Sequence, residues 1–394
     1  MDNDKKILGV TPNVFFLGLV SFFNDFSAEM VQSVMPVFIT TVLGAPVFFV
    51  GLLEGAADAL SSVLKFFSGW FSDRIQQRKL PAVVGYAISV GIRPLFSIVT
   101  RFWQLFGLRV ADRIGKGFRD APRDALISES AGKGELGKSF GFHRSLDALG
   151  ATLGPLTAFL VLPLINSNYR QLFLIAFFIG LAAIFSFVFV KDKKIENNAA
   201  AAKPKLNFGL LKANKRFALI VFSLFVFGLG TLPILMVLLK AKETGLPASA
   251  VPFVYFLYSL TFVLTAVPLG KLADKIGERT IIAGGFLAAV FAYFGLASAT
   301  ASLPVLLLFA LLGLYSAATD GLQRALAAKN LSEDILATGQ GFLNMAIGFS
   351  SLFAGIIGGL LWTKINSAAA LNYAGILSVL GLFLFLRLSR TSKT

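Results

Sequence analysis

Apolar and polar positions along this chain fall into long blocks, with apolar runs separated by short polar turns. An α-helix needs roughly 20 apolar residues to cross a hydrocarbon core of about 30 Å, and the runs have this length. The pattern predicts twelve membrane-spanning helices, at residues 12–41, 46–71, 81–100, 103–127, 138–162, 169–190, 215–239, 248–271, 279–299, 302–327, 335–362 and 369–388.

The composition points to the same class of protein. Of the 394 residues 56% are hydrophobic, and the mean hydropathy is +0.76, whereas soluble domains contain about 45–50% apolar residues. We therefore expect an all-α polytopic membrane protein. The first apolar run is too long for a signal-peptide core and has no small-residue cleavage site, so we expect a signal anchor that stays. The lack of cysteine excludes disulfides and thiolate metal sites.

Positive charge is concentrated in alternate turns between the predicted spans. The formal net charge is +15, and basic residues gather in the even-numbered turns, such as Arg74, Arg78 and Lys79 after the second span. Because cytoplasmic loops carry an excess of Lys and Arg, both termini are expected in the cytoplasm. The same rule accounts for the net positive charge, so we expect no nucleic-acid partner. The expected partners are the lipid bilayer, protons and a small-molecule substrate.

The two halves of the chain resemble each other at an offset of 200 or 201 residues (120 to 320 and 69 to 270). GWFSDRIQQRK at 69–79 matches GKLADKIGERT at 270–280, and DAPRDAL at 120–126 matches DGLQRAL at 320–326. These matches predict two pseudo-symmetric six-helix halves. We expect an N-terminal bundle at 1–190, a mobile cytoplasmic linker at 191–214 and a C-terminal bundle at 215–394.

One predicted span carries an unusual number of charges. The segment Leu108–Ser130 lies between apolar runs in a chain that is only 14% charged. An ionisable group at the bilayer centre costs roughly 2.5–3.5 kcal/mol on insertion scales, so such groups face protein or a wet cavity. The segment contains Arg109, Asp112, Arg113, Lys116, Arg119, Asp120, Arg123 and Asp124.

Three motifs carry a resemblance to the major facilitator superfamily over essentially the full chain. The turn after the second span is similar to G-x-L-x-D-R-x-G-R-K/R, here with Gly69, Asp73, Arg74, Arg78 and Lys79. The fourth span is similar to R-x-x-Q-G-x-G through Arg113 and Gly117, with Lys116 and Arg119 departing from it. The fifth span matches an antiporter pattern, G-x8-G-x3-G-P-x2-G-G, at Gly141, Gly150, Gly154 and Pro155, and departs from it at the final pair.

The resemblance implies a twelve-helix major facilitator fold and a function in transport. It implies that Gly69, Asp73 and Arg74 form a gating latch at the cytoplasmic side, repeated in the second half by Asp274 and Lys275. Arg119 and Arg123 follow toward the cytoplasm and are expected to be partners of this latch. The small residues of the antiporter motif are expected to pack closely against a neighbouring helix, which in this family is the eighth.

Buried charges of the first half are the expected site of recognition and coupling. Asp25 and Glu29 are four residues apart and share a helix face, as do Glu54 and Asp58. We name Asp25, Glu29, Asp58 and Arg113 as candidates for proton coupling, with Arg113 as the partner of Asp25. The expected substrate cavity is lined by Asn24, Asp25, Glu54, Arg113, Lys116, Arg144, Asp147, Tyr255 and Asn344. Static buried pairs that hold helices together are the alternative interpretation.

The remaining expectations concern chemistry and mechanism. His143 is the only histidine, and its position favours a structural, hydrogen-bonded role over a pH switch. No metal-ligand cluster, nucleophile elbow or phosphate-binding loop is present in the sequence, so we expect no enzyme activity, cofactor or metal.

The leading hypothesis is a secondary active transporter of the bacterial inner membrane, a monomer that exports a small amphipathic or charged organic molecule in exchange for protons. Uptake or exchange of an organic anion bound by Arg113, Lys116 and Arg144 is the alternative. A non-transporting membrane sensor is the alternative of another class.

Overall fold

The computed structural model describes residues 6–75, 78–132, 134–192, 214–331 and 335–388, and within its helices it leaves out the side chains of 65–75 and 336–337. Backbone contacts divide the chain into two compact units. Unit 1 comprises Met1–Val34 and Leu64–Lys203, and unit 2 comprises Met35–Val63 and Pro204–Thr394. The predicted linker falls almost wholly outside the described residues, and the predicted boundaries of two six-helix halves stay a prediction.

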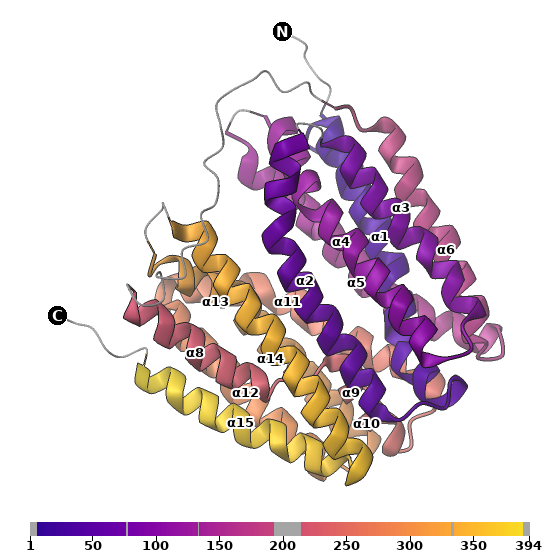
Figure 1. Cartoon of the computed structure of the whole chain (residues 1–394), viewed down its shortest axis with the longest axis vertical. Helices are drawn as coiled ribbons and strands as arrows, with labels where there is room; N and C mark the ends of the chain where they lie inside the picture. The colour runs from indigo at the N-terminus through magenta and orange to yellow at the C-terminus, as the bar shows by residue number, and fades with distance from the viewer. Residues whose placement is uncertain (1–5, 76–77, 133, 193–213, 332–334, 389–394) are drawn as a thin grey trace. The chain divides into compact units, whose positions relative to one another are not determined.

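Unit 1 is a bundle of long helices. It contains most of α1 (Pro12–Val37), the end of α2 (Val47–Ile75), α3 (Lys79–Leu95), α4 (Phe102–Ser130), α5 (Leu136–Leu164) and α6 (Tyr169–Ser186). Figure 1 shows α3 beside α6, and α3 also packs along α4. A cluster of fully buried apolar side chains, among them Leu17, Tyr86, Ile127 and Phe187, fills the space between α1, α3, α4 and the segment after α6.

Polar contacts join the segment before α1 to the turn before α5 in unit 1. A tight turn with left-handed backbone at Gly9 precedes α1, and Lys6 Nζ lies 2.6 Å from Glu135 Oε1 in the turn before α5. Hydrogen bonding from the Lys6 ammonium lowers the pKa of the Glu135 carboxyl group. This contact therefore stabilises the fold above the ordinary glutamate pKa and is lost as the pH falls through the lowered value.

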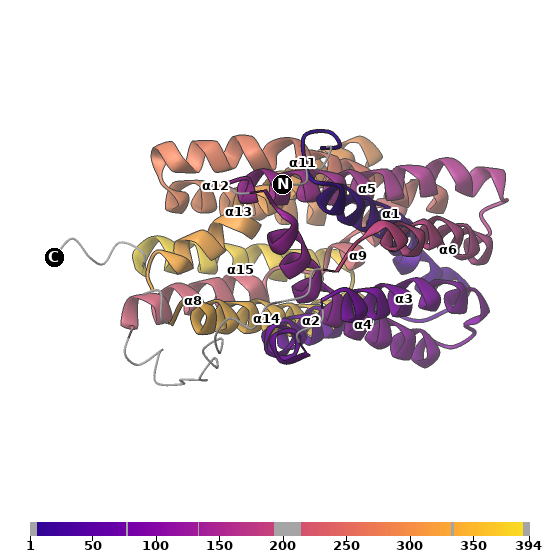
Figure 2. The ribbon, with the colours of Figure 1, turned by 90° about the horizontal axis from the view of Figure 1, so that it is seen from above.

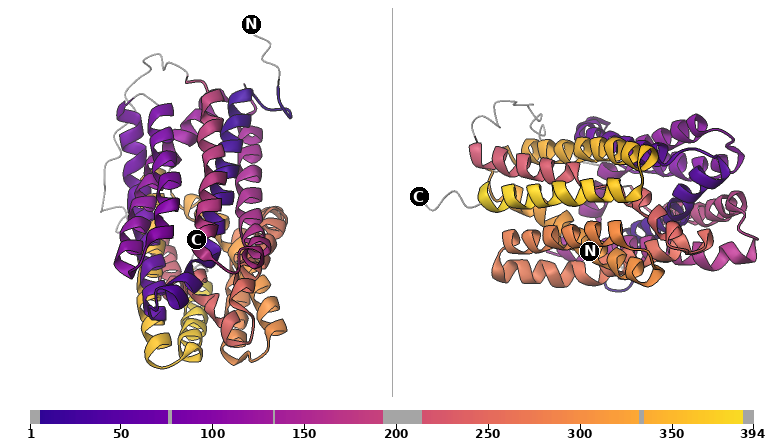
Figure 3. Two further views of the ribbon diagram at one scale, coloured as in Figure 1. Left: turned by 90° about the vertical axis from the view of Figure 1, so that its right-hand side faces the viewer. Right: turned by 90° about the horizontal axis from the view of Figure 1, so that it is seen from below.

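Unit 2 holds the first part of α2 and the helices of the second half. These are α8 (Lys215–Leu229), α9 (Ile234–Val237), α10 (Leu239–Glu243), α11 (Val251–Ile276), α12 (Glu278–Ser298), α13 (Ser302–Ala328), α14 (Leu336–Lys364) and α15 (Ser367–Leu388). In Figures 2 and 3, α11, α12 and α13 lie together, as do α8, α14 and α15, and α12 packs against α15 to join the two groups.

The prediction of an all-α membrane protein is confirmed. Within the described residues, eleven helices are long and apolar enough to cross a membrane. The 29-residue α4 is not among them, because its charged residues interrupt the apolar run. The sequence repeat is reflected in the helix bounds, since α14 begins and ends 200 residues after α5 (136 to 336 and 164 to 364).

The predicted seventh span is a broken helix. α8 ends at Leu229, and the chain continues through residues 230–233 before α9 begins at Ile234. Pro233 has no amide hydrogen to continue an α-helical ladder. The hydroxyl group of Tyr373 donates to the freed carbonyl oxygen of Leu229 at 2.9 Å, which supplies the partner that the break removes.

Within unit 2, α2 and α14 meet through backbone contacts at glycines. A Cβ atom added to Gly51 would collide with the carbonyl oxygen of Gly355, and one added to Gly355 would collide with that of Gly51. One added to Gly55 would lie 2.8 Å from the Cα atom of Leu352. Small residues let helix backbones approach closely in membranes, where van der Waals packing drives association.

We predict that Gly355→Val lowers the thermal stability of the solubilised protein, because the added side chain forces the two helices apart. Overpacking of this kind costs about 1–3 kcal/mol, which corresponds to several degrees in unfolding temperature. Tryptophan fluorescence on heating measures the shift. Gly284→Val on α12 is the matched control, since open space surrounds that position. Equal unfolding temperatures for the two variants would contradict the packing account.

Candidate functional site

The amide side chain of Asn24 is the centre of a buried polar network in unit 1. Asn24 lies on α1 and is fully buried. Its Oδ1 atom accepts from Arg93 Nη2 at 2.6 Å and from Arg119 Nη1 at 3.3 Å, while its Nδ2 atom donates to Asp25 Oδ1 at 2.7 Å. The amide therefore joins two guanidinium groups, from α3 and α4, to a carboxylate on α1.

Buried arginines dominate this network. Arg93, Arg109, Arg113 and Arg119 have exposed fractions of 3%, 5%, 8% and 5%. Arg93 also donates to the backbone carbonyl of Asn24 at 3.0 Å. Buried guanidinium groups need acceptors inside the protein, because desolvation of an unpaired charge is costly.

Two of the α4 arginines have recorded partners in unit 1 beyond Asn24. Arg109 donates to Gln32 Oε1 on α1 at 2.9 Å and lies 3.5 Å from Asp112. Arg119 lies 3.7 Å from Asp120, and its guanidinium carbon is 4.5 Å from the centroid of the Tyr86 ring on α3. A cation over an aromatic face is an attractive contact that strengthens on desolvation.

α5 approaches α1 closely through the glycines of the predicted antiporter motif. Gly150 faces the backbone of Phe22 and Phe26, and Gly154 faces the backbone of Phe26 and Met30. The predicted close packing at these glycines is present within unit 1, where α1 lies against them, and packing against the eighth helix stays a prediction. Gly141, at the start of the motif, faces open space, and Pro155 is buried inside α5.

His143 lies one turn before Asp147 on α5 and is 2% exposed. The hydroxyl group of Ser21 on α1 is 2.7 Å from His143 Nε2 and 3.1 Å from the hydroxyl group of Tyr86. The sequence favoured a hydrogen-bonded structural histidine, and these contacts fit that interpretation.

The other predicted cavity residues of the first half are spread more widely. Asp147 pairs with Arg144 at 3.2 Å, and the Arg144 side chain is 69% exposed. Lys116 and Glu29 are half-buried on α4 and α1. Glu54 and Asp58 belong to unit 2, where Glu54 is buried and Asp58 accepts from the Ser351 hydroxyl at 2.8 Å. The described contact of Asp58 is therefore with α14.

The predicted residues of the second half lie in unit 2. Tyr255 is buried and stacks on Tyr258 with 5.8 Å between ring centroids, and the Tyr258 hydroxyl is 2.8 Å from that of Ser316. Asn344 is half-buried on α14. Phe227 is stacked on Phe286 in the core, with 3.5 Å between the ring centroids.

The structure describes only part of the predicted latch. Gly69, Asp73 and Arg74 lie on α2, but their side chains are outside the described residues. Asp274 and Lys275 are exposed at the end of α11. Arg123 pairs with Asp124 at 2.9 Å and with Asp120 at 3.6 Å. Arg119 is buried beside Asn24, so its described contacts lie within the network of unit 1.

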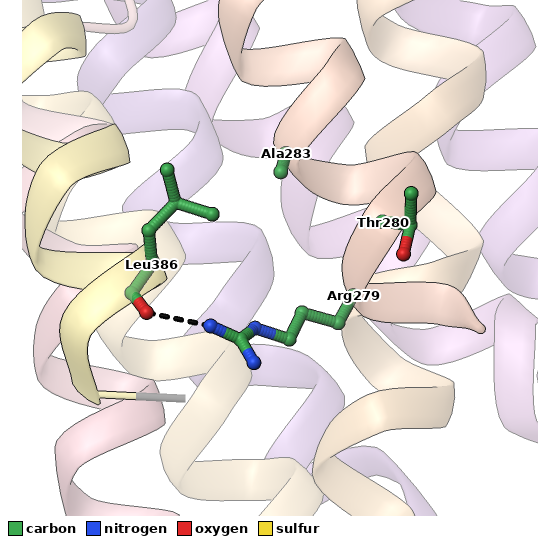
Figure 4. A pocket seen from close by; sticks show the side chains of 4 residues that line it. All are labelled: Arg279, Thr280, Ala283 and Leu386. Carbon is green, nitrogen blue, oxygen red and sulfur yellow. Dashed lines mark hydrogen bonds between the residues drawn. The ribbon is translucent and has the colours of Figure 1, made fainter. Parts of the chain in front are cut away.

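A pocket of about 230 Å³ lies in unit 2, between the start of α12 and the end of α15. Figure 4 shows its lining by Arg279, Thr280, Ala283 and Leu386, with the Arg279 guanidinium donating to the Leu386 carbonyl. This contact engages the one charged side chain of the lining. The pocket therefore offers less for recognition than the network in unit 1.

Three buried polar or charged residues, Arg93, Tyr86 and Lys240, were not predicted from the sequence as parts of buried networks. Arg93 sits alone in an apolar span before Pro94, and a single arginine in such a span was the signal available. Tyr86 carries no charge and gave no signal of its own. Lys240 follows directly after the predicted span 215–239, yet it is 7% exposed and lies 3.5 Å from Glu243, whose other oxygen accepts from the Trp362 indole at 3.1 Å.

Comparison with known proteins identifies the family. The model of the Major Facilitator Superfamily matches residues 17–251 and 226–394. The chain belongs to the major facilitator superfamily, whose members are secondary transporters, and it is therefore a transporter rather than an enzyme. The predicted superfamily and fold are confirmed, and the alternative of a non-transporting sensor is not supported.

Relatives occur in archaea and bacteria. An uncharacterized MFS-type transporter of Methanocaldococcus jannaschii is 32% identical over 391 residues, which cover 98% of this chain and 96% of the relative. The uncharacterized MFS-type transporter YuxJ of Bacillus subtilis is 27% identical, with 74% and 76% covered. The chain is therefore a multi-pass membrane protein of a family that is not confined to bacteria.

Solved structures share the fold. The nucleoside transporter NupG has a TM-score of 0.77 at 15% identity, with 96% of this chain and 99% of that chain covered. A peptide transporter POT has a TM-score of 0.81 at 13% identity, with 98% and 95% covered.

We predict that Asn24→Leu destabilises the protein more than a comparable change elsewhere. The substitution keeps the side-chain volume but removes the acceptor of Arg93 and Arg119, and a buried donor left without its acceptor costs about 1–3 kcal/mol, more when charged. Asn372→Leu, at an exposed position on α15, is the control. The unfolding temperature of each purified variant measures the effect, and a shift no larger for Asn24→Leu would show that the amide does not hold the network together.

Proposed function

We propose that this transporter exports a small amphipathic or charged organic molecule in exchange for protons, by alternating access. The observation that carries the proposal is the position of Asp25, a carboxylate on a membrane helix that lies within a network of buried arginines. A carboxylate in such a place changes its proton affinity when a nearby cation moves or a substrate binds. The network thus supports coupling through Asp25, with Asn24 and Arg119 as its neighbours.

The sign of the coupling depends on the charge of the substrate. Binding of a proton to a carboxylate removes one negative charge from the site, so a cationic substrate and the proton compete for it. By thermodynamic reciprocity each then lowers the affinity of the other, which is the condition for exchange. An antiporter that uses Asp25 is therefore expected to carry substrates with a cationic end.

Uptake or exchange of an organic anion is the second candidate, because arginines outnumber the carboxylates in direct contact with Asn24. Arg113, Lys116 and Arg144 would bind a carboxylate or phosphate. Protonation of Asp25 would then strengthen binding of the anion, so that proton and anion would move together. The two candidates therefore predict opposite effects of pH on substrate affinity.

Cellular setting and assembly complete the proposal. We place the protein in the inner (plasma) membrane of a bacterium and expect it to act as a monomer. Glu29, Asp58 and Arg113 remain further candidates for coupling, and the latch at Gly69, Asp73 and Arg74, with Asp274 and Lys275 in the second half, is the proposed cytoplasmic gate. The alternative is that the buried pairs only hold the helices together, and the following experiment distinguishes it from proton coupling.

We predict that proteoliposomes with an internal pH dye show proton flux when a transported amphipathic amine is added, and that Asp25→Asn abolishes it. The reason is that the amide binds no proton in the range of the assay. Organic acids are tested in parallel, since they would drive flux of the opposite sign under the second candidate. Asp320→Asn is the control, because it removes an exposed ion-paired carboxylate of unit 2. Substrate movement without proton flux in the wild-type protein would overturn proton coupling.

A further inference from the structure

Two facing pairs of polar side chains join α1 to α5, and we call them the α1–α5 ladder. Ser21 and Asp25 are four residues apart on α1, and His143 and Asp147 are four residues apart on α5. Ser21 is hydrogen-bonded to His143 at 2.7 Å. One helical turn further along both helices, Asp25 and Asp147 occupy the corresponding facing positions, and Asp147 is the charged group that acts most strongly on the Asp25 carboxyl group.

The second pair brings two carboxyl groups face to face. An ionised carboxylate is an acceptor only, so two of them hydrogen-bond each other only when one carries a proton. Like charges that face each other repel, and paired carboxylates elsewhere hold a single proton between them. A shared proton is therefore the state in which Asp25 and Asp147 meet without repulsion.

The surroundings of the pair set its charge. From α4 come Arg119 and Lys116, and from α3 comes Arg93, each within electrostatic range of Asp25. α5 itself supplies Arg144, which pairs with Asp147 at 3.2 Å. On α1, Glu29 lies on the far side of Asp25 from His143, and His143 faces Arg123 and Asp120 of α4. These cations stabilise one negative charge on the pair, which is the charge of the singly protonated state.

The ladder is closed on one side and open on the other. Beyond Asp147, Gly150 and Gly154 bring the two helix backbones into contact and leave no room for side chains between them. Asp147 itself retains an exposed side-chain fraction of 18%. The Ser21–His143 contact, also bonded to Tyr86, fixes the register in which the two carboxyl groups meet.

We propose that the coupling proton is shared by Asp25 and Asp147 across α1 and α5, rather than held by Asp25 alone. Asp147 is thereby a second proton-binding residue, and Ser21 and His143 are positioning residues. The inference rests on the proposed function for its role in transport, but the presence of the shared proton does not. Release of the proton places two negative charges between α1 and α5, which favours their separation or the entry of a cation.

The experiment uses infrared spectroscopy of the purified full-length protein, with the proton as the probe. The C=O stretching band of protonated carboxyl groups is followed as the pH is changed. We expect a titrating band in the wild type that is lost in both Asp25→Asn and Asp147→Asn, because each substitution removes one of the two carboxyl groups that share the proton. Asp320→Asn is expected to keep it.

Further variants keep the inference open to refutation. If Asp147→Asn does not fold, Asp147→Glu retains a carboxyl group and is expected to keep the band with a displaced midpoint, since the midpoint belongs to the pair. His143→Gln keeps a side-chain partner for Ser21 and is expected to leave the midpoint close to that of the wild type, whereas His143→Ala shifts it.

Two outcomes overturn the shared proton. One is a band that persists unchanged in Asp147→Asn or, if only Asp147→Glu folds, a wild-type midpoint in that variant. The other is a band lost in Asp25→Asn alone. In either case substrate-driven proton flux that depends on Asp25 would leave the proposed function standing. A band that behaves as expected, together with absence of any proton flux, would instead reject antiport and keep the pair.

Discussion

The fold of unit 1 depends on keeping arginine side chains in a membrane-embedded bundle without leaving them unpaired. A guanidinium group away from water needs hydrogen-bond acceptors in fixed positions. Asn24 supplies one acceptor to two arginines from different helices, and Gln32 supplies another to Arg109. Neutral amides satisfy the donors without cancelling their charge, so the network stays positive and responsive to a carboxylate that gains or loses a proton.

This requirement connects the packing of the helices to the proposed coupling. The acceptors come from α1, the arginines come from α3 and α4, and the glycines of α5 hold that helix against α1. A displacement of α5 relative to α1 would alter the separation of Asp25 and Asp147 together with the surroundings of Arg119. The same contacts therefore contribute both to the stability of unit 1 and to the proposed coupling. If the network never releases its proton, the buried pairs are purely structural.

Much of the architecture could be predicted from the sequence, because it follows from long apolar runs and from a repeat between the two halves. The bounds of α5 and α14 show how closely the two halves correspond. Pro233 lies within the predicted seventh span, and a proline at that position is a sequence signal for the break between α8 and α9. Partners across helices were harder to predict, since spacing along one helix says which side chains share a face and not which helix covers it. Glu54 and Asp58 illustrate this, because Gly51 and Gly55 beside them draw that part of α2 onto α14.

The proposed coupling requires that the buried network of unit 1 holds a proton that substrate displaces. The most direct test is proton release in weakly buffered detergent solution, measured with a pH dye as an amphipathic amine is titrated into the purified protein. We expect the wild-type protein to release protons in an amount that saturates together with amine binding, and we expect no proton release from Asp25→Asn. Saturable binding with no change in pH would contradict the proposed coupling, and proton uptake on binding of an organic acid would favour cotransport of an anion instead.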